Sequence, residues 1–371
     1  MWKVILGTAF LASWMLIGSA WAEDPPGEKV GGVKSLEERM DQLEQALGRK
    51  VEGDRWYDRI QVGGRIEVEA GYGKVDYDDP ALDDEESSDV DLATVELAVD
   101  ARIHPNVDGH VLFKYEDDDL FVDEGYIAIS GGERCGGYLI AGLQYLPFGN
   151  FNTHFVTDPN TLILGETNDG AAVVGYRFFG EKLDLSVGAF NGEAQEAGKN
   201  DQINSFVAAV KANAFEGLDM GISYTSNLAA ANCFDDAEVL PDPENLDSLV
   251  GGWSVFVTFQ FLERFKLIGE YVAALDDFEA GEIYAGDSQA RKPTAWNTEL
   301  GVALLENLEL AVRYGGSDDG GADFLPESQY GGVLNWGFFK NTNLAFEYLH
   351  DEFEENAQKK DTFTAQLAVD F

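Results

Sequence analysis

The sequence predicts an all-β fold, a transmembrane antiparallel β-barrel of about 16 strands preceded by a short N-terminal α-helix or coiled coil. Three observations support this prediction. Segments with an apolar side chain at every second position recur from residue 60 onward, the connections between them alternate in length, and aromatic residues gather near the segment ends. With 41 glycines, 10 prolines and 45% hydrophobic residues, the chain fits neither a disordered nor a fibrous class.

Residues 1–22 have the features of a secretory signal peptide. They carry a lone Lys3, an apolar stretch and the small-x-small motif Ala20-Trp21-Ala22. The alternative is an uncleaved membrane anchor. After this segment no run approaches the ~18 apolar residues that a spanning helix needs. The sequence therefore predicts a protein that is exported to the cell outer membrane and crosses it with strands.

The chain is strongly acidic, with a formal net charge of -43, and removal of the signal peptide would make it one unit more negative. This charge excludes nucleic-acid binding, because that affinity depends on Lys and Arg at phosphates. It also argues against a general phosphate pore. Only two cysteines, Cys135 and Cys233, are present, so no disulfide framework holds the fold together.

The segment before the barrel is predicted to contain a flexible leader at residues 23–34 and a periplasmic helix at residues 35–52. Ser35 provides an N-cap, with Glu38 at the capping-box position. The apolar positions of the helix follow an a/d seam of about two heptads: Leu36, Met40, Leu43 and Leu47. Two interpretations stay open, a single amphipathic helix lying on the barrel or a coiled coil that joins chains into a homodimer or homotrimer.

The barrel itself is predicted over residues 56–371. In the stretch IQVGGRIEVEAGYG, Val62 and Ile66 share one face, while Arg65 and Glu67 share the other, which is the period of two that a strand requires. Strands are expected to start near residues 60, 89, 109, 123, 138, 169, 182, 202, 217, 250, 264, 294, 307, 329, 342 and 361.

The connections between these segments alternate in length. The even-numbered ones are short, for example HPNVD, GGERCGG, LERF and FFKN. Most odd-numbered ones are long and acidic, for example KVDYDDPALDDEESS, YEDDDLFVDE and HDEFEENAQKKD. Short periplasmic turns and longer outside loops are typical of an outer-membrane barrel, whereas a soluble sandwich has no reason to sort its loops in this way.

Aromatic residues near the strand ends match the interfacial girdles of such barrels: Trp56, Tyr57, Tyr72, Trp253, Trp296, Tyr314, Trp336, Phe338, Phe339 and Phe371. The last segment, DTFTAQLAVDF, carries its apolar face through to Phe371. This terminal aromatic resembles the signal by which the barrel assembly machinery recognises its clients. In the predicted topology Cys135 lies in an inside turn and Cys233 in an outside loop, too far apart for a disulfide, so two free thiols are expected.

No catalytic constellation, cofactor motif or metal site is found, so an enzyme is not predicted. There is no HExxH or GxSxG motif, and GGERCGG lacks a phosphate-loop lysine. The four histidines are dispersed: His104, His110, His154 and His350. The aspartate runs at 83–86 and 117–119 lack the spacing of a calcium loop and are expected to be solvated. Divalent ions bridging them to lipopolysaccharide are the alternative.

The lumen is expected to carry charges of both signs. Inward-facing candidates are Arg65, Glu67, Glu69, Glu96, Asp100, Arg102, Lys114, Arg177, Lys266, Glu270, Glu299, Arg313 and Glu347. They would either build a transverse field between facing acidic and basic rows or pair with one another and keep the lumen wet. The connection at 146–167 is the constriction candidate, because Phe148, Phe151 and Phe155 make it too apolar for a loop in water.

Several stretches together resemble the LbtU family of siderophore porins. They are LEERMDQLEQAL, GGRIEVEAGYGK, DVDLATVELAVDA, GHVLFKYEDDD with VDEGYIAI, and AGLQYLPFGNF followed by DPNTLILGET, which cover most of residues 35–190. The resemblance implies a sixteen-stranded outer-membrane barrel that admits a ferric siderophore without a plug domain. The alternative is a general diffusion porin that prefers small cationic solutes, since an acidic lumen and rim favour cations. A third class is a non-transport adhesin or lipopolysaccharide-anchored scaffold.

Overall fold

The computed structural model describes residues 59–77, 82–116, 118–132, 135–199, 202–235, 239–321, 323–353 and 358–371. The predicted signal peptide, leader and periplasmic helix, together with Trp56 and Tyr57, lie outside these residues. Among the described residues, no helix combines the length and the apolar character that crossing a bilayer requires.

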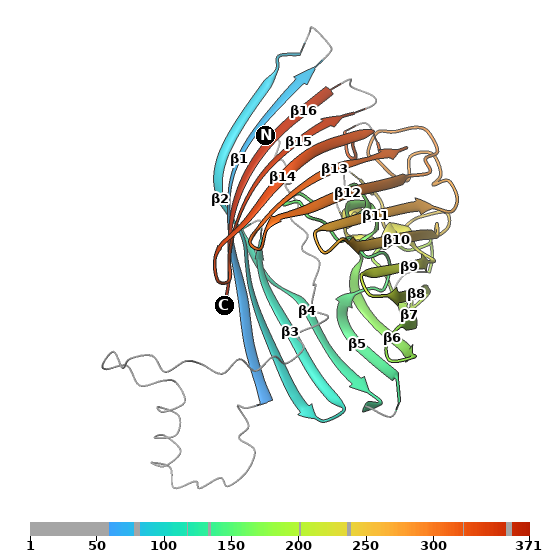
Figure 1. Ribbon diagram of the computed structural model, residues 1–371. Helices are drawn as coiled ribbons and strands as arrows, with labels where there is room; N and C mark the ends of the chain where they lie inside the picture. The colour runs from blue at the N-terminus through green and yellow to red at the C-terminus, as the bar shows by residue number, and fades with distance from the viewer. Residues whose placement is uncertain are drawn as a thin grey trace, which may run out of the picture.

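Sixteen antiparallel strands form one closed barrel in which each strand pairs with its neighbours in the sequence and β1 pairs with β16 (Figure 1). The strands are β1 (Ile60–Tyr77), β2 (Glu85–His104), β3 (Val107–Glu116), β4 (Asp119–Ser130), β5 (Gly137–Tyr145), β6 (Asn168–Phe178), β7 (Leu183–Phe190), β8 (Ser205–Phe215), β9 (Leu218–Thr225), β10 (Gly252–Phe261), β11 (Phe265–Ala274), β12 (Thr294–Leu305), β13 (Leu308–Asp318), β14 (Ser328–Phe339), β15 (Thr342–Glu352) and β16 (Gln358–Asp370). The connections contain the helix α2 (Asn160–Gly165) and the 3-10 helices η3 (Leu228–Ala230) and η4 (Asn232–Asp235).

The barrel is closed at the end of the chain by Phe371. Its backbone N–H and C=O exchange hydrogen bonds of 3.0 Å with Gly64 of β1. The ring lies over Gly64, where an added Cβ would come within 2.5 Å of the ring Cζ and of the Glu96 carbonyl oxygen. Glycine is therefore required at this position by close approach, and the phenyl ring covers the backbone that the glycine leaves bare.

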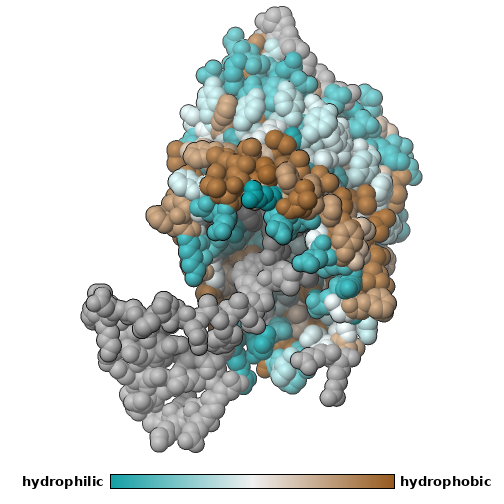
Figure 2. Space-filling model, in the orientation of Figure 1, coloured by the Kyte–Doolittle hydropathy of each residue, from teal (hydrophilic) through white to brown (hydrophobic). Residues whose placement is uncertain are grey.

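The two faces of the wall are sorted as the alternating pattern predicts. On β1, Val62 and Ile66 are 61% and 40% exposed, whereas Glu67 and Glu69 on the other face are 1% and 9% exposed. Figure 2 shows hydrophobic residues gathered in a band across the visible outer face, with hydrophilic residues gathered beyond it. Apolar side chains outside and polar side chains inside are the arrangement that a barrel needs in a bilayer.

All sixteen predicted strands are confirmed, and each begins within four residues of its expected position. The prediction of a long second outside connection is wrong, because β3 runs to Glu116 and β4 starts at Asp119. Apolar alternation marks only the part of a strand that meets hydrocarbon, whereas backbone pairing continues in water with any polar side chain. The same effect lengthens β1, β2 and β16, where acidic and basic residues pair across the ladder, as Asp76 does with Lys359.

The two cysteines are free, as predicted. Cys135 lies in the connection between β4 and β5, and Cys233 lies in η4, between β9 and β10. The connection that holds Cys135 joins the inner ends of its strands, and the connection that holds Cys233 joins the outer ends. The two thiols therefore lie at opposite ends of the barrel.

Candidate functional site

The connection between β5 and β6, here called the inner loop (residues 146–167), lies inside the barrel. Its ends are tied by a hydrogen bond of 2.9 Å from the Leu146 N–H to the Thr167 carbonyl oxygen. From there it crosses to side chains of β9, β11, β12, β13 and β15, and most of its residues are buried. The loop thus occupies part of the interior of the barrel, and a constriction at this point stays a prediction.

Three inward-facing glutamates hold successive parts of the inner loop by its backbone. Glu270 of β11 accepts hydrogen bonds from the N–H groups of Asn150 at 2.8 Å and Phe151 at 2.7 Å. Glu299 of β12 accepts from the N–H of His154 at 2.7 Å, and Glu347 of β15 accepts from the N–H of Val156 at 2.6 Å. A buried loop needs such acceptors, because its N–H groups have no ladder to join.

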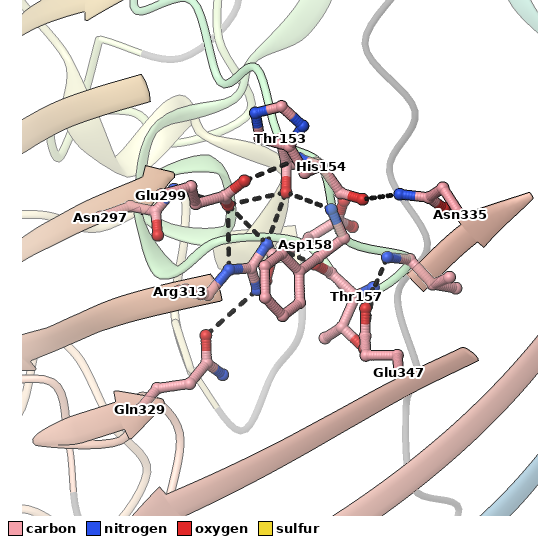
Figure 3. A network of polar contacts seen from close by, with 12 residues as sticks. Thr153, His154, Thr157, Asp158, Asn297, Glu299, Arg313, Gln329, Asn335 and Glu347 are labelled. Carbon is pink, nitrogen blue, oxygen red and sulfur yellow. Dashed lines mark hydrogen bonds and ion pairs between the residues drawn. The ribbon is translucent and has the colours of Figure 1, made fainter. Parts of the chain in front are cut away.

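Arg313 of β13 fastens the middle of the loop (Figure 3). Its side chain and that of Glu299 are both 0% exposed, and the two groups lie 3.0 Å apart. The same guanidinium donates to the Thr157 carbonyl oxygen at 2.8 Å and to Thr153 Oγ1 at 2.6 Å, and its carbon lies 4.2 Å from the centroid of the Phe155 ring. The arginine therefore joins the loop to Glu299 and Gln329 of the barrel wall.

His154 joins the loop to the inner part of the same wall. Its Nδ1 lies 2.6 Å from Glu309 Oε1, and its carbonyl oxygen accepts from Asn335 at 2.8 Å. We call the inner face of β11–β15, with these anchors, the anchor wall.

The three phenylalanines of the inner loop lie beneath it and do not line the passage. Phe148 and Phe151 pack against Gly165 and Val272, and Phe155 belongs to a second buried cluster with residues of the anchor wall. The half-buried polar residues of the loop are Asn150, Asn152, Thr153 and Thr157, and the hydroxyls of the two threonines donate to Glu299 and Glu347. Sequence reasoning missed these residues, because alternation of polar and apolar positions within a loop has no fixed period.

The inner face of β1–β4, which β16 separates from the anchor wall, is here called the acidic wall. Arg65, Glu96 and Lys114 are direct cross-strand partners on β1, β2 and β3. One pleat step further out, Glu67 faces Thr94 across β1 and β2. The remaining acidic groups on the described part of this wall and its edge are Glu69, Asp91, Asp100, Glu116, Asp123 and Glu124. The two basic groups are thus outnumbered.

Glu166, at the end of the inner loop, faces the acidic wall. The charges that act on its carboxyl group are those of Lys114, Asp123, Glu116 and Glu124. The pKa of Glu166 is raised to about 8, chiefly by burial; Lys114 lowers it, and the three neighbouring carboxylates add to the rise. The inner loop therefore adds a titratable acid to an already acidic surface.

Two of the predicted lumen residues lie away from this site. Arg102 is 74% exposed and pairs with Asp108 at 3.3 Å, and Arg177 pairs with Asp184 at 3.3 Å across β6 and β7. Both side chains have the inward parity, but they lie at the inner strand ends and bind acids at or beside the adjacent turns. Of the two alternatives for the lumen charges, Arg102, Arg177 and Arg313 adopt the paired one, each with an acid on a neighbouring strand.

The described parts of the outside connections (residues 191–199, 202–204, 226–235, 239–251, 275–293, 319–321 and 323–327) pack together, and we call them the loop cluster. Phe278, Ile283 and Leu246 are buried to 1% exposure or less and share one apolar core with Leu164 of the inner loop. Backbone bonds tie the connections to one another, such as the Tyr284 N–H to the Val239 carbonyl oxygen. The acidic composition of these loops concealed this core, and their scattered large apolar residues were its signal.

Within the described residues, no group of three or more His, Cys, Asp or Glu side chains is arranged to hold a metal ion. A closed barrel of sixteen strands, polar inside, apolar outside and with a loop in its interior, has the fold of outer-membrane porins.

Solved structures agree with this class. The outer membrane channel DcaP of Acinetobacter baumannii superimposes with a TM-score of 0.60 at 14% identity, covering 84% of this chain and 97% of that one. Salmonella typhi OmpF and the anion-selective porin from Comamonas acidovorans each give a TM-score of 0.56 at 11% identity, over 84% of this chain and 97% and 99% of theirs. At these identities the likeness shows the fold.

Sequence relatives are also found. The chain is 25% identical over 307 residues to a UPF0422 protein of Coxiella burnetii, covering 79% of this chain and 64% of the relative. It is 22% identical over 327 residues to a UPF0422 protein of Legionella pneumophila, covering 79% and 59%. The chain thus spans three fifths to two thirds of the length of these relatives. No protein-family model matches it, and its resemblance to the LbtU siderophore porins stays a hypothesis.

Proposed function

We propose that this protein is a channel of the cell outer membrane that passes small solutes and prefers cations. The observation that carries the proposal is the acidic wall, where the described carboxylates outnumber the basic groups. The half-buried residues of the inner loop are uncharged, among them Asn150 and Asn152. A passage with one acidic side and one neutral side attracts cations and repels anions throughout its narrow part.

The anchor wall does not contribute comparably to this field. Glu270, Glu299 and Glu347 are buried and accept hydrogen bonds from N–H groups of the inner loop, and Glu299 also accepts from Arg313. Outside the barrel, the connections are acidic and extend the same sign of potential to the entrance. Both features give the passage a negative electrostatic potential from its outer entrance to the inner loop.

The proposal is tested by reversal potentials of the refolded protein in planar bilayers under a KCl gradient. We expect discrete conductance steps and a permeability ratio of K+ to Cl− above unity at neutral pH. Absence of conductance would favour the adhesin or scaffold class, and a ratio below unity would contradict the assignment of the acidic wall.

Passage of a ferric siderophore is the second candidate. The stretches that resemble siderophore porins form β1–β5 and the inner loop, which together make up the candidate passage. The acidic wall favours ferric complexes of net positive charge over polyanionic ones. Titration of the purified barrel with ferric siderophores of either charge, and iron uptake by a deletion strain with and without the intact gene, separate this candidate from general diffusion.

The remaining expectations follow from the same class of protein. The apolar outer face would contact outer-membrane lipid, the acidic loops would face lipopolysaccharide, and Phe371 would serve as the assembly signal. Assembly into dimers or trimers is a further expectation, which cross-linking in membranes would test. An enzymatic activity is not proposed, because the solved structures of this fold compared above are named as channels and porins.

A further inference from the structure

Lys114 is a buried cation surrounded by an excess of carboxylates. Its side chain is 5% exposed, and its ammonium nitrogen lies 2.9 Å from Glu116 Oε2. Glu96 is its direct cross-strand partner on β2, and the charge of Asp123 acts on it from β4. A lysine is buried to this degree only where acids compensate its charge.

A second observation lies next to this lysine. Glu67 and Thr94 are cross-strand partners, 1% and 2% exposed, and neither Glu67 Oε1 nor Thr94 Oγ1 has a hydrogen-bond partner. Glu67 Oε1 lies 3.6 Å from the Arg65 guanidinium, which is too long for a hydrogen bond. Buried acceptors without partners are costly, so a wall that keeps two of them together has acceptors available for a donor.

We propose that these groups form a binding site for alkylammonium cations, and that Lys114 is its built-in occupant. The site, here called the ammonium cradle, consists of Glu67, Thr94, Glu96, Glu116 and Asp123. It rests on the proposed cation channel and names the class of solute that this wall recognises.

The cradle fits an ammonium group for two reasons. Its four carboxylates carry two more negative charges than Lys114 and Arg65 balance. A further cation would reduce this excess of negative charge. Its free acceptors are one carboxylate oxygen and one hydroxyl oxygen, and a primary ammonium brings three N–H donors to satisfy them. Lys114 is itself an alkylammonium on a four-carbon stem, so the wall already accommodates this group in its native state.

The test removes the occupant. Lys114→Met keeps the length of the side chain and deletes the ammonium group, which as a tethered competitor has an effective concentration on the order of millimolar. We expect butylammonium to reduce the single-channel current of this variant with an apparent Kd at least tenfold lower than in the wild type. Tetraethylammonium, which has no N–H donor, should gain much less.

Lys266→Met is the matched control, because it removes an inward-facing lysine of β11 on the anchor wall and changes the net charge equally. Glu67→Gln in the Lys114→Met background should abolish the gain. Equal butylammonium block in the Lys114 and Lys266 variants would overturn the cradle. The KCl reversal potential of the wild type is independent of this comparison, so failure of the cradle and failure of the cation channel are distinguishable.

Folding of each variant is checked by heat-modifiable mobility on gels. If Lys114→Met does not fold, Lys114→Gln takes its place, with a polar group in the same volume. A folded Lys114→Gln protein without increased affinity for butylammonium would likewise contradict the proposal.

Discussion

Glu299 and Glu67 are both glutamates on the inner face of the barrel, and both are 1% exposed. Glu299, on the anchor wall, accepts from the N–H of His154, and its other oxygen lies 3.0 Å from Arg313. Glu67, on the acidic wall, has an oxygen without a hydrogen-bond partner. Equal burial thus accompanies opposite bonding in the two halves of one barrel.

The difference shows that buried glutamates have two different roles in this barrel. A carboxylate whose oxygens are filled by loop N–H groups has a structural role, because its charge is neutralised by the donors that it holds. A carboxylate that keeps a free acceptor still projects its charge into the lumen and can bind a passing donor. Charge counts alone cannot separate the two, whereas the hydrogen-bond partners do.

The largest effect is expected from breaking the anchor wall. Glu299→Ala leaves Arg313 buried without its partner, which costs about 3–5 kcal/mol. We expect a lower free energy of unfolding in guanidinium chloride and larger, noisier single-channel currents, because the inner loop loses its central attachment. The double variant Glu299→Met with Arg313→Met should lose less, since no unpaired charge is left. Glu306→Gln, in an exposed turn, is the control, and an equal effect there would contradict the anchoring role.

A second effect concerns the packed loops above the anchor wall. Cys233 lies against their apolar core, and burial, followed by the charge of Asp235, raises its thiol pKa well above the usual value. Cys135 is exposed. Because the thiolate is the reactive form, we expect Cys233 to react with maleimide on the order of tenfold more slowly than Cys135.

Maleimide labelling of Cys233 also tests whether the loop cluster is packed. Phe278 is 0% exposed and its ring centroid lies 5.9 Å from that of Phe234, the neighbour of Cys233. Phe278→Ala should accelerate labelling of Cys233 and leave the rate at Cys135 unchanged. Rapid labelling of both thiols in the wild type would show that the loops are not packed in solution.

The anchor wall and the loop cluster also show how much of the structure could be predicted from the sequence. The strands were predictable because contact with hydrocarbon imposes alternation of apolar and polar side chains on every strand. The position of the inner loop within the barrel was predictable from the apolar side chains of Phe148, Phe151 and Phe155. The partners of the lumen glutamates were not predictable. Val156 and Glu347 are 191 residues apart in the chain, and only the folded barrel brings that N–H to that carboxylate. The packed core around Phe278 was missed for the same reason.

On the acidic wall, removing charge should change selectivity and leave the fold intact. We expect Glu67→Gln together with Glu96→Gln to lower the permeability ratio of K+ to Cl− roughly two- to fourfold, with screening by salt limiting the effect. Reversal potentials at low and high KCl measure it, and the effect should shrink at high salt. Glu270→Gln is the matched control on the anchor wall, where the carboxylate is covered. An equal loss of selectivity there would remove the distinction between the walls.

The smallest effect is a pH dependence at Glu166, where the inner loop meets the acidic wall. Burial raises the pKa of this carboxyl group from 4.5 to about 8, so it is neutral at pH 6 and ionised at pH 9. The permeability ratio of K+ to Cl− should therefore rise across this interval, by roughly twofold or less for one added charge.

Stability should change in the opposite direction over the same interval. The folded state holds the Glu166 proton more tightly than the unfolded state does, so this group's contribution is most favourable below pH 4.5 and is lost as the pH rises towards 8. Glu166→Gln should flatten both profiles between pH 6 and pH 9. Reversal potentials and guanidinium unfolding curves at matched pH values measure the two together. If Glu166→Gln and the wild type show the same changes of permeability ratio and stability with pH, groups other than Glu166 cause them. The charge that the inner loop presents to the acidic wall would then be constant over this interval.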